Sequence, residues 1–216
     1  MSRQAESGNA DSPQYQGSSS SDGRGVDLYW LPLGAGGHSV RLNGIAYEAL
    51  IARLERRARC DLYHSALEIG VSDGRFVIEM TPVRAADGAE CDVVAGGAVG
   101  ARWAGRFPIF RYEIRRWRDG FIPDIAEAVE SPRHVISDPE GAQRVLNLVP
   151  SVPTPVWGRD ELKTGDMWNS NSVVSWLLVR SGVDPKSIRP PTGGRAPGWQ
   201  AGLVVAHRQM EQQRFA

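Results

Sequence analysis

Cysteine is scarce in this sequence: Cys60 and Cys91 are the only two among 216 residues. Two cysteines are too few for a disulfide scaffold, and no Cys-x-x-Cys pair is present. The cysteines and the four histidines also form no cluster with the spacing of zinc ligands. We therefore expect a reduced, cytoplasmic location and no metal or other cofactor, while export by a route that reads no classical signal stays open.

Long apolar runs and an excess of one charge are also missing. No stretch of about 20 consecutive apolar residues occurs, and the first residues, MSRQAESGNA, lack the apolar centre of a signal peptide. The 25 basic and 25 acidic residues cancel, and a neutral chain has no general attraction to nucleic acid or to an anionic membrane. We therefore expect no transmembrane segment and no nucleic-acid partner.

The sequence does contain enough apolar residues for one folded unit. Hydrophobic residues make up 41% of the chain and seven tryptophans occur, which fits a single domain with a sizeable core. Residues 1–24 are rich in Ser, Gly and Gln, with little to bury, so they predict a disordered tail. The expected organisation is this tail, one domain over residues 25–210, and a C-terminal tail over residues 211–216.

The first half of the domain predicts a strand, a helix and a hairpin. Residues 26–31 are apolar and aromatic, which suits a buried strand. Apolar residues recur with helical spacing over residues 42–59, which predicts an amphipathic helix. Residues 62–71 and 75–80 are apolar runs around Ser-Asp-Gly at 72–74, and Asp-Gly in this context is a strong hairpin signal.

The second half mixes an irregular segment with further elements. Residues 84–105 are rich in Gly and Ala and predict an irregular excursion, whereas side chains alternate over residues 107–117 as in a strand. A helix is predicted over residues 139–148, with Asp138 as its N-cap and proline at its first position. The apolar run over residues 202–207 predicts a last strand.

A compact polar run opens the most informative helix. Residues 169–172 are Asn-Ser-Asn-Ser, and the apolar stretch after them predicts a helix that ends near Arg180. Unpaired N–H groups at a helix N-terminus attract anions and developing negative charge. A nucleophile at such a helix start is a recurrent arrangement in hydrolases. Well upstream, His64 lies at the mouth of the predicted hairpin.

The hairpin and this helix start together resemble a known family. The segment HSALEIGVSDGRFVIEMTP, residues 64–82, resembles the histidine-containing hairpin of circularly permuted papain-like proteins, which include NlpC-type peptidases and lecithin:retinol acyltransferase-like enzymes. In that group the catalytic histidine comes first, and an Asn-Cys motif at a later helix start supplies the nucleophile. The order is the same here, and the likeness covers about residues 60–82 and 166–180. It implies an α+β fold of permuted papain-like type, with a small, mostly antiparallel sheet flanked by helices.

The resemblance also implies catalytic roles. Carried over by position, it makes His64 the general base, Glu79 the residue that orients it, and Ser170 the nucleophile in place of the family's cysteine. A nucleophile needs a base to take its proton, and the base needs a partner that fixes its tautomer. Serine stays protonated until it attacks, so Ser170 depends on His64 and on an oxyanion site, where one donor is worth about 3 kcal/mol.

Each of these residues also has a structural interpretation. His64 can be a half-buried strand histidine, and Glu79 a solvent-facing charge. Ser170 can belong to an N-cap, where Ser, Asn and Asp are preferred and worth about 1 kcal/mol. Asn169 and Asn171 can donate to an oxyanion or hold the loop, and we favour the loop for both.

Three further signals are weaker. Trp168 and Trp176 can wall a substrate pocket for an acyl group, although aromatic residues at this spacing are usually core. The glycine-rich loop at residues 34–37 lacks both phosphate-binding fingerprints and predicts a turn. Basic and aromatic residues interleave over residues 111–118, as in some nucleic-acid binders. Charged side chains also protect sheet edges, and we favour that interpretation in a neutral chain.

Two functions from different classes follow. The first is a hydrolase or acyltransferase that acts on an amide, ester or thioester bond of a peptide, a peptidoglycan fragment or a lipid-like acyl substrate. The second is a catalytically inactive papain-like module, a pseudoenzyme, that binds a peptide or acyl ligand. The first requires His64 and Ser170 to meet, and the second does not.

Overall fold

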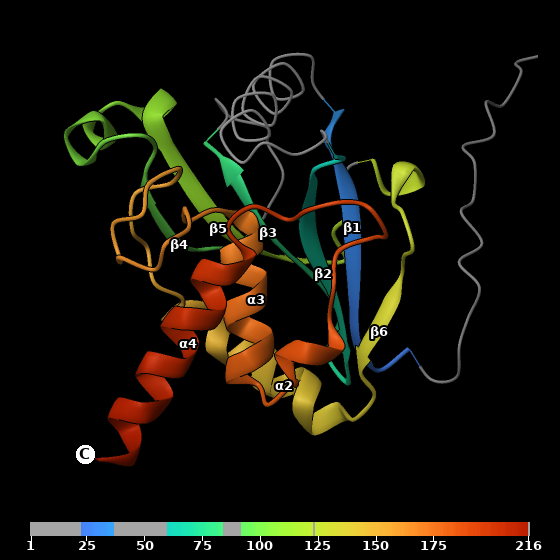
Figure 1. Ribbon diagram of the computed structural model, residues 1–216. Coiled ribbons are helices and arrows are strands. Elements are labelled where there is room, and N and C mark those ends of the chain that lie inside the picture. The colour runs from blue at the N-terminus through green and yellow to red at the C-terminus, as the bar shows by residue number, and fades with distance from the viewer. Residues whose placement is uncertain (1–22, 37–59, 84–91, 123, 216) are drawn as a thin grey trace, which may run out of the picture.

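The computed structural model describes residues 23–36, 60–83, 92–122 and 124–215. Six strands form one sheet in the order β4-β5-β3-β2-β1-β6, and each neighbouring pair is antiparallel (Figure 1). The strands are β1 Gly25–Gly36, β2 Tyr63–Val71, β3 Gly74–Pro82, β4 Asp92–Ala98, β5 Arg111–Arg118 and β6 Arg133–Ile136. With the helices that follow, the fold is α+β, as the sequence predicts.

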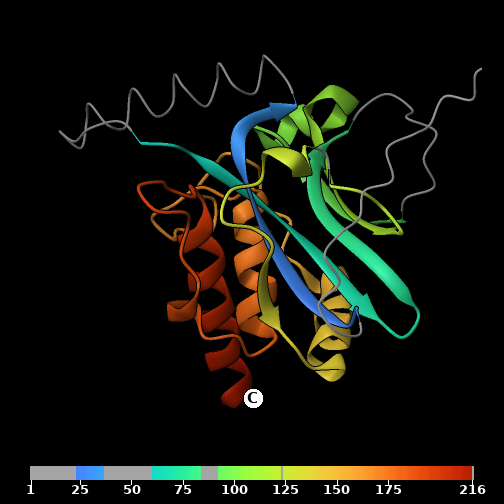
Figure 2. The same ribbon diagram turned by 90° about the vertical axis from the view of Figure 1, so that its right-hand side faces the viewer.

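Within the described residues, three α-helices lie on one face of the sheet. They are α2 Pro139–Leu148, α3 Ser170–Arg180 and α4 Trp199–Arg214. α3 lies against the sheet, and α4 packs on the outer side of α3 (Figures 1 and 2). All residues from Asn171 to Val179 are therefore buried, because a helix enclosed on both sides has no solvent-facing stripe.

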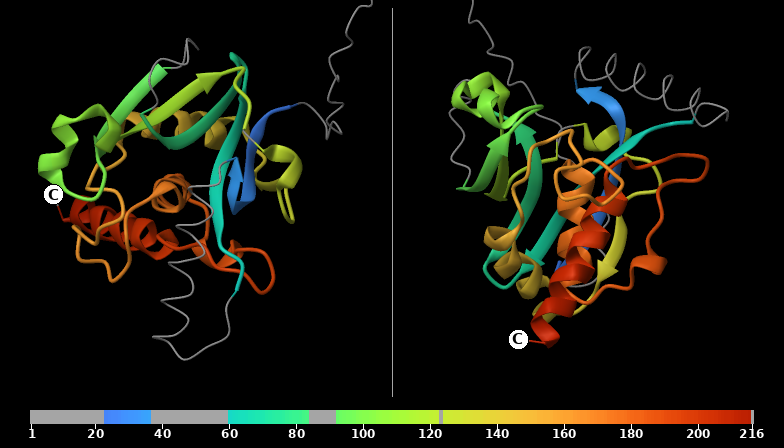
Figure 3. Two further views of the ribbon diagram at one scale, coloured as in Figure 1. Left: turned by 90° about the horizontal axis from the view of Figure 1, so that it is seen from above. Right: turned by 60° about the vertical axis from the view of Figure 1, so that its left-hand side comes forward.

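Short 3₁₀ helices connect the larger elements. They are η1 Arg102–Arg106, η2 Pro108–Phe110, η3 Ile125–Glu127, η4 Val149–Ser151 and η5 Pro185–Ser187. Two of them, η1 and η2, lie between β4 and β5 at one margin of the molecule (Figure 3). η3 belongs to the segment that packs on the sheet face opposite α3.

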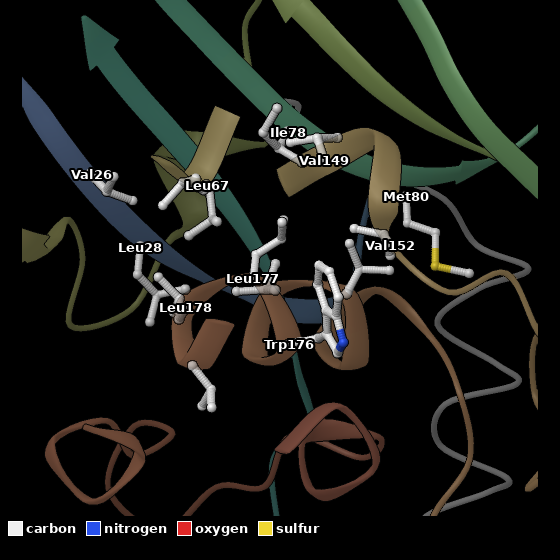
Figure 4. Close-up of a cluster of buried hydrophobic side chains, with 14 of the residues drawn as sticks. Val26, Leu28, Leu67, Ile78, Met80, Val149, Val152, Trp176, Leu177 and Leu178 are labelled. Carbon is white, nitrogen blue, oxygen red and sulfur yellow. The ribbon is translucent and has the colours of Figure 1, made fainter. Parts of the chain in front are cut away.

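The main hydrophobic core lies between the sheet and the helices. Leu67 of β2, Ile78 of β3 and Leu177 of α3 are fully buried there, beside Val149 and Trp176 (Figure 4). Burying one such side chain contributes about 2 kcal/mol. This core fixes α3 against the middle of the sheet and so determines where the polar start of α3 lies.

A second, smaller core lies on the opposite face of the sheet. Its buried members are Tyr29, Leu31, Ala66, Val77 and Ile122. Successive side chains of a strand point to opposite faces, so β1 sends Leu28 and Trp30 to the helices and Tyr29 and Leu31 to the other side. The side chains of β2, of β3 and of residues 25–33 of β1 can therefore be assigned to a face.

Several local predictions are confirmed. β2 and β3 form the predicted hairpin, with Ser72 and Asp73 in the turn and Gly74 at a φ of +126°. α2 begins after Asp138, whose side chain accepts a hydrogen bond from the backbone N of Gly141. α3 begins and ends at the predicted residues. Each of these features is determined by a few adjacent residues, so the sequence is sufficient to predict it.

Two predictions between residues 84 and 117 are wrong in part. The excursion over residues 84–105 is not wholly irregular, because β4 and η1 lie within it. The strand predicted from Phe107 begins only at Arg111, because Pro108–Phe110 forms η2. Proline fixes φ near the helical value and suits the first position of such a turn, and this local preference outweighs the alternation that continues into β5.

The strand predicted over residues 202–207 is wrong, since these residues lie inside α4. A Cβ at Gly202 would lie 2.1 Å from the backbone O of Ser172, so glycine here lets α4 approach α3 closely. The buried residues of this part of α4 recur with helical spacing: Ala201, Gly202, Val205 and Ala206. Packing on α3 overrides the strand preference of the valines. α4 continues to Arg214, into the expected C-terminal tail.

Two expectations concern residues that the structure does not describe. The predicted helix over residues 42–59 and residues 1–22 of the expected tail lie outside the described ranges. Within those ranges, no helix is long and apolar enough to cross a membrane.

Candidate functional site

The start of α3 is closed by its own polar residues. Asn169 is the N-cap, and its Oδ1 accepts from the backbone N of Asn171 at 2.9 Å and of Ser172 at 3.4 Å. Ser172 Oγ accepts in return from the backbone N of Asn169 at 3.0 Å. This reciprocal pair is a capping box. Asn169 and Ser172 are thus explained by the need to start a helix.

Asn171 joins α3 to β2 and to the segment before α4. Its side chain is 1% exposed, and its Oδ1 accepts a hydrogen bond from Ser65 Oγ at 2.8 Å. Its Nδ2 donates to the backbone O of Tyr63 at 2.9 Å and to that of Pro197 at 2.8 Å. Both amide protons and the carbonyl oxygen are therefore occupied, as buried polar groups require. Asn171 holds three segments together and has no donor left for an oxyanion.

The next two serines of α3 bond to the start of α4. Ser172 Oγ donates to the backbone O of Gly198 at 2.7 Å, and Ser175 Oγ donates to that of Trp199 at 2.8 Å. Both serines are fully buried. Small side chains are needed where two helices approach this closely, as Gly202 also indicates. These hydroxyls serve helix packing.

The segment that precedes α4 is also hydrogen-bonded to residues just before α3. Asp166 accepts from the backbone N of Gly198 at 2.8 Å and from that of Met167 at 2.8 Å. Burial raises the pKa of the Asp166 carboxyl, and these hydrogen bonds act against that rise. Asn169 Nδ2 donates to the backbone O of Pro197 at 2.8 Å. Asp166 therefore positions the segment before α4.

Ser170 differs from its neighbours in the polar run. It is the first residue of α3 and is half-buried. Among the residues that the structure describes, neither its hydroxyl nor its backbone N–H has a hydrogen-bond partner. The N-cap oxygen bonds to the next two N–H groups instead. Ser170 therefore offers two donors at the positive end of a buried helix.

His64 points to the other face of the sheet. In the β1–β2 ladder, Leu31 pairs with His64 and Trp30 pairs with Ser65, and directly opposed residues share a face. Leu31 belongs to the second core, whereas Ser65 bonds to Asn171 of α3. The side chain of His64 consequently lies on the face away from α3.

The structure thus does not bring His64 to Ser170. A general base has to lie within hydrogen-bond reach of the proton that it takes, and the sheet separates these two side chains. The reason is the two-residue period of a strand: the neighbour that faces α3 is Ser65. The sequence pattern showed the order of the two motifs but not the face to which the histidine points.

The surroundings of His64 keep its ring neutral at pH 7. Burial lowers the pKa of His64 to about 4, and the charge of Asp124 acts in the opposite direction. Asp124 precedes η3 and has a φ of +58°. Sequence reasoning missed Asp124, because 60 residues separate the two and no spacing links them. A neutral, desolvated histidine suits the second core better than a proton relay.

Glu79 lies on the same face of the sheet as His64, but the two residues are not paired with each other across β2 and β3. It stands two residues beyond Val77 of the second core, so the alternation of β3 gives it the same orientation. The recorded β2–β3 ladder ends at the pair Leu67 and Ile78, before it reaches His64. Glu79 is instead opposite Arg115 of β5. The predicted His–Glu contact stays a prediction.

Trp168 belongs to the main core. It is 1% exposed, as are Trp30 and Trp176, and Trp30 packs on Trp199 with ring centroids 5.0 Å apart. The indole N–H groups of Trp30 and Trp168 are buried without a hydrogen-bond partner among the described residues. Trp168 thus supports the fold behind the start of α3 and does not wall an open pocket.

Among the described residues, no three side chains of the metal-binding types lie together. The alternating pattern of β2 puts Ser65 and His64 on opposite faces of the sheet. Only the register with β1 shows that Ser65 is the residue that meets Asn171 of α3. Comparisons with family models, curated proteins and solved structures find no match for this chain.

Proposed function

We propose that the chain is a catalytically inactive module of papain-like type that binds a peptide or acyl ligand at the start of α3. The observation that carries this proposal is that His64 and the start of α3 lie on opposite faces of the sheet. A serine without a base in reach is a weak nucleophile. The low pKa of His64 and its position on the sheet face of the second core also favour a structural role for it.

Binding is supported by the donors that the fold leaves unused. Asn169, Asn171 and Ser172 are all engaged in side-chain hydrogen bonds within the chain, whereas the hydroxyl and the backbone N–H of Ser170 have no partner among the described residues. The N-terminus of a helix attracts carbonyl and carboxylate oxygens. A peptide terminus and a fatty acyl chain both carry such a group, so the ligand chemistry is a carboxylate or carbonyl with an extended chain attached.

Covalent labelling tests the inactive state. The folded protein is exposed to a fluorophosphonate, which reacts with activated serines, and its intact mass is measured. We expect no mass shift in the wild type, in Ser170→Ala or in His64→Ala. A shift in the wild type that Ser170→Ala abolishes contradicts the proposal.

Ligand titration tests the binding role. The wild type is titrated with octanoate and, separately, with the tripeptide Ala-Ala-Ala, by isothermal calorimetry. Affinity should survive Ser170→Ala, which leaves the helix N-terminus open, and should be lost in Ser170→Trp, whose side chain fills it. Heat from one ligand and not the other distinguishes the acyl from the peptide source. No heat from either ligand contradicts binding at this place.

The second candidate is an active serine hydrolase that uses a base other than His64. The observation that favours it is the uncommitted hydroxyl of Ser170 at a helix start. Labelling that Ser170→Ala abolishes but His64→Ala leaves unchanged is the result that this candidate requires.

A further inference from the structure

Large apolar side chains are exposed on the connection between β4 and β5. We call residues 102–111, which comprise η1, η2, their junction and the first residue of β5, the aromatic tip. Trp103 is 67% exposed, Phe107 49%, Ile109 76% and Phe110 46%. Single exposed apolar residues are common, but four within eight residues mark an interaction surface.

The aromatic tip carries charge of one sign only. Arg102, Arg106 and Arg111 are exposed along it, and no Asp or Glu occurs from Val93 to Tyr112. Glu161 pairs with Arg102 from another segment, whereas Arg106 Nε donates to the backbone O of Trp103. The tip is therefore a local cationic patch on a chain whose net charge is zero.

The exposure does not come from a loose backbone. The backbone N of Phe107 donates to Ala104 O at 2.9 Å, and that of Phe110 donates to Phe107 O at 3.0 Å. Val99 N donates to Phe110 O at 2.8 Å and closes the base of the tip. Backbone groups that are paired internally can enter an apolar medium without a large penalty. The tip thus presents its apolar side chains on a fixed frame.

The shape and size of the tip fit a lipid surface better than a protein partner. It projects from the margin of the sheet, beyond β4 and β5 and away from α3 (Figures 1 and 3). A stable protein interface uses about 20–30 residues on each side, far more than this tip provides. Aromatic residues and arginines are the side chains that settle at the boundary between headgroups and acyl chains.

We propose that the aromatic tip inserts into the interface of an anionic lipid bilayer. Trp103, Phe107, Ile109 and Phe110 enter the headgroup–acyl boundary, and Arg106 and Arg111 contact anionic headgroups. Because few side chains take part, binding is reversible and depends on anionic lipid and on ionic strength. This inference is independent of the function proposed for the start of α3.

Co-sedimentation with vesicles tests the apolar contribution. Large unilamellar vesicles of about one quarter phosphatidylglycerol and three quarters phosphatidylcholine should carry the wild type into the pellet. The variant with Trp103→Ser, Ile109→Ser and Phe110→Ser should lose about tenfold or more in binding. Phe121→Ser is the matched control, because Phe121 is 63% exposed but lies beyond the far end of β5, and it should bind as the wild type does.

A second pair of measurements tests the charge. Vesicles of phosphatidylcholine alone, or addition of about 0.5 M NaCl, should weaken wild-type binding strongly. Arg106→Gln with Arg111→Gln should weaken binding to the anionic vesicles and leave the small residual binding to neutral vesicles unchanged. Far-ultraviolet circular dichroism checks that each variant is folded. If the triple variant is not, the single change Ile109→Glu replaces it and should reduce binding in the same direction.

The opposite results overturn the proposal. They are a wild type that stays in the supernatant with anionic vesicles, or folded tip variants that bind as the wild type does. Light scattering after size exclusion identifies the main competing occupant, a second copy of this chain. Self-association that the triple variant abolishes, without vesicle binding by the wild type, assigns the tip to a contact between copies and ends the lipid proposal.

Discussion

The start of α3 and the aromatic tip depart from the usual distribution of side chains in opposite directions. At the start of α3, the polar side chains of Asn171, Ser172 and Ser175 are buried, and each has hydrogen-bond partners within the chain. At the aromatic tip, Trp103 and Ile109 are apolar and exposed, and no packing within the described residues covers them.

The difference shows which side chains in an unusual environment indicate a function and which are explained by folding. A buried polar residue whose every bond ends in the same chain is explained by folding, however much its sequence resembles a catalytic motif. An exposed apolar cluster on a rigid frame has no such explanation, since folding gains nothing from it. If the two regions differ in this way, substitutions of buried residues at the start of α3 reduce the stability of the fold, and substitutions at the aromatic tip do not.

Removing the Asn171 side chain should have the largest effect on stability. Asn171→Ala leaves Ser65 Oγ and the backbone O atoms of Tyr63 and Pro197 buried without these partners. We expect the free energy of unfolding to fall by about 4 kcal/mol, measured by urea denaturation. Ser170→Ala is the matched control and should change it by less than about 0.5 kcal/mol. Similar losses in both variants contradict the structural role of Asn171.

Filling the contact between α3 and α4 comes next. Gly202→Ala places a Cβ 2.1 Å from the backbone O of Ser172 and 2.1 Å from Ser175 Oγ. The two helices have to move apart, and we expect a loss of about 3 kcal/mol in the free energy of unfolding. The double variant Gly202→Ala with Ser175→Ala should recover part of the loss, because one of the two close atoms is gone. If Gly202→Ala leaves the free energy of unfolding unchanged, the close approach of α3 and α4 is contradicted.

The pH dependence of stability tests the burial of His64. Its pKa is about 4 when folded and near 6.5 when unfolded, so the unfolded chain binds more protons between these values. Stability is therefore full above pH 6.5 and is lost as the pH falls toward 4. We expect a loss of about 2 kcal/mol between pH 7 and pH 5. His64→Gln should remove this part of the pH dependence, and an unchanged profile in His64→Gln contradicts burial.

Changing the exposed tip should have the smallest effect on stability. Ile109→Ser removes a side chain that is 76% exposed, so the free energy of unfolding should change by less than about 0.5 kcal/mol. The same variant should reduce binding to anionic vesicles. A large loss of stability instead indicates that Ile109 packs within the chain, and the contrast between the two regions then disappears.

Much of the local structure could be predicted because its signals are local. Asp-Gly between apolar runs indicated the β2–β3 hairpin, and Asp138 before Pro139 indicated the start of α2. The polar run before an apolar stretch indicated the start of α3. In each case the turn or helix start is determined by residues that are adjacent in the sequence.

The errors arose where distant contacts decide the outcome. The valines of α4 favour a strand when they are considered alone. They lie in a helix because Gly202 lets α4 pack closely against Ser172 and Ser175 of α3. For the candidate site, the order of His64 and Ser170 was visible in the sequence. Their faces were not, because the face of a strand residue follows from its register with β1.

By itself, the sequence determined the α+β character of the protein, its hairpin, the starts of α2 and α3 and the polar run that caps α3, since propensity and capping act within a few residues. Only the tertiary structure decided that Ser65 faces α3 and His64 faces the second core, and that the residues of the aromatic tip are exposed together. The physical reason is that burial and facing depend on which distant segments pack together, and a one-residue change of register reverses every side chain of a strand.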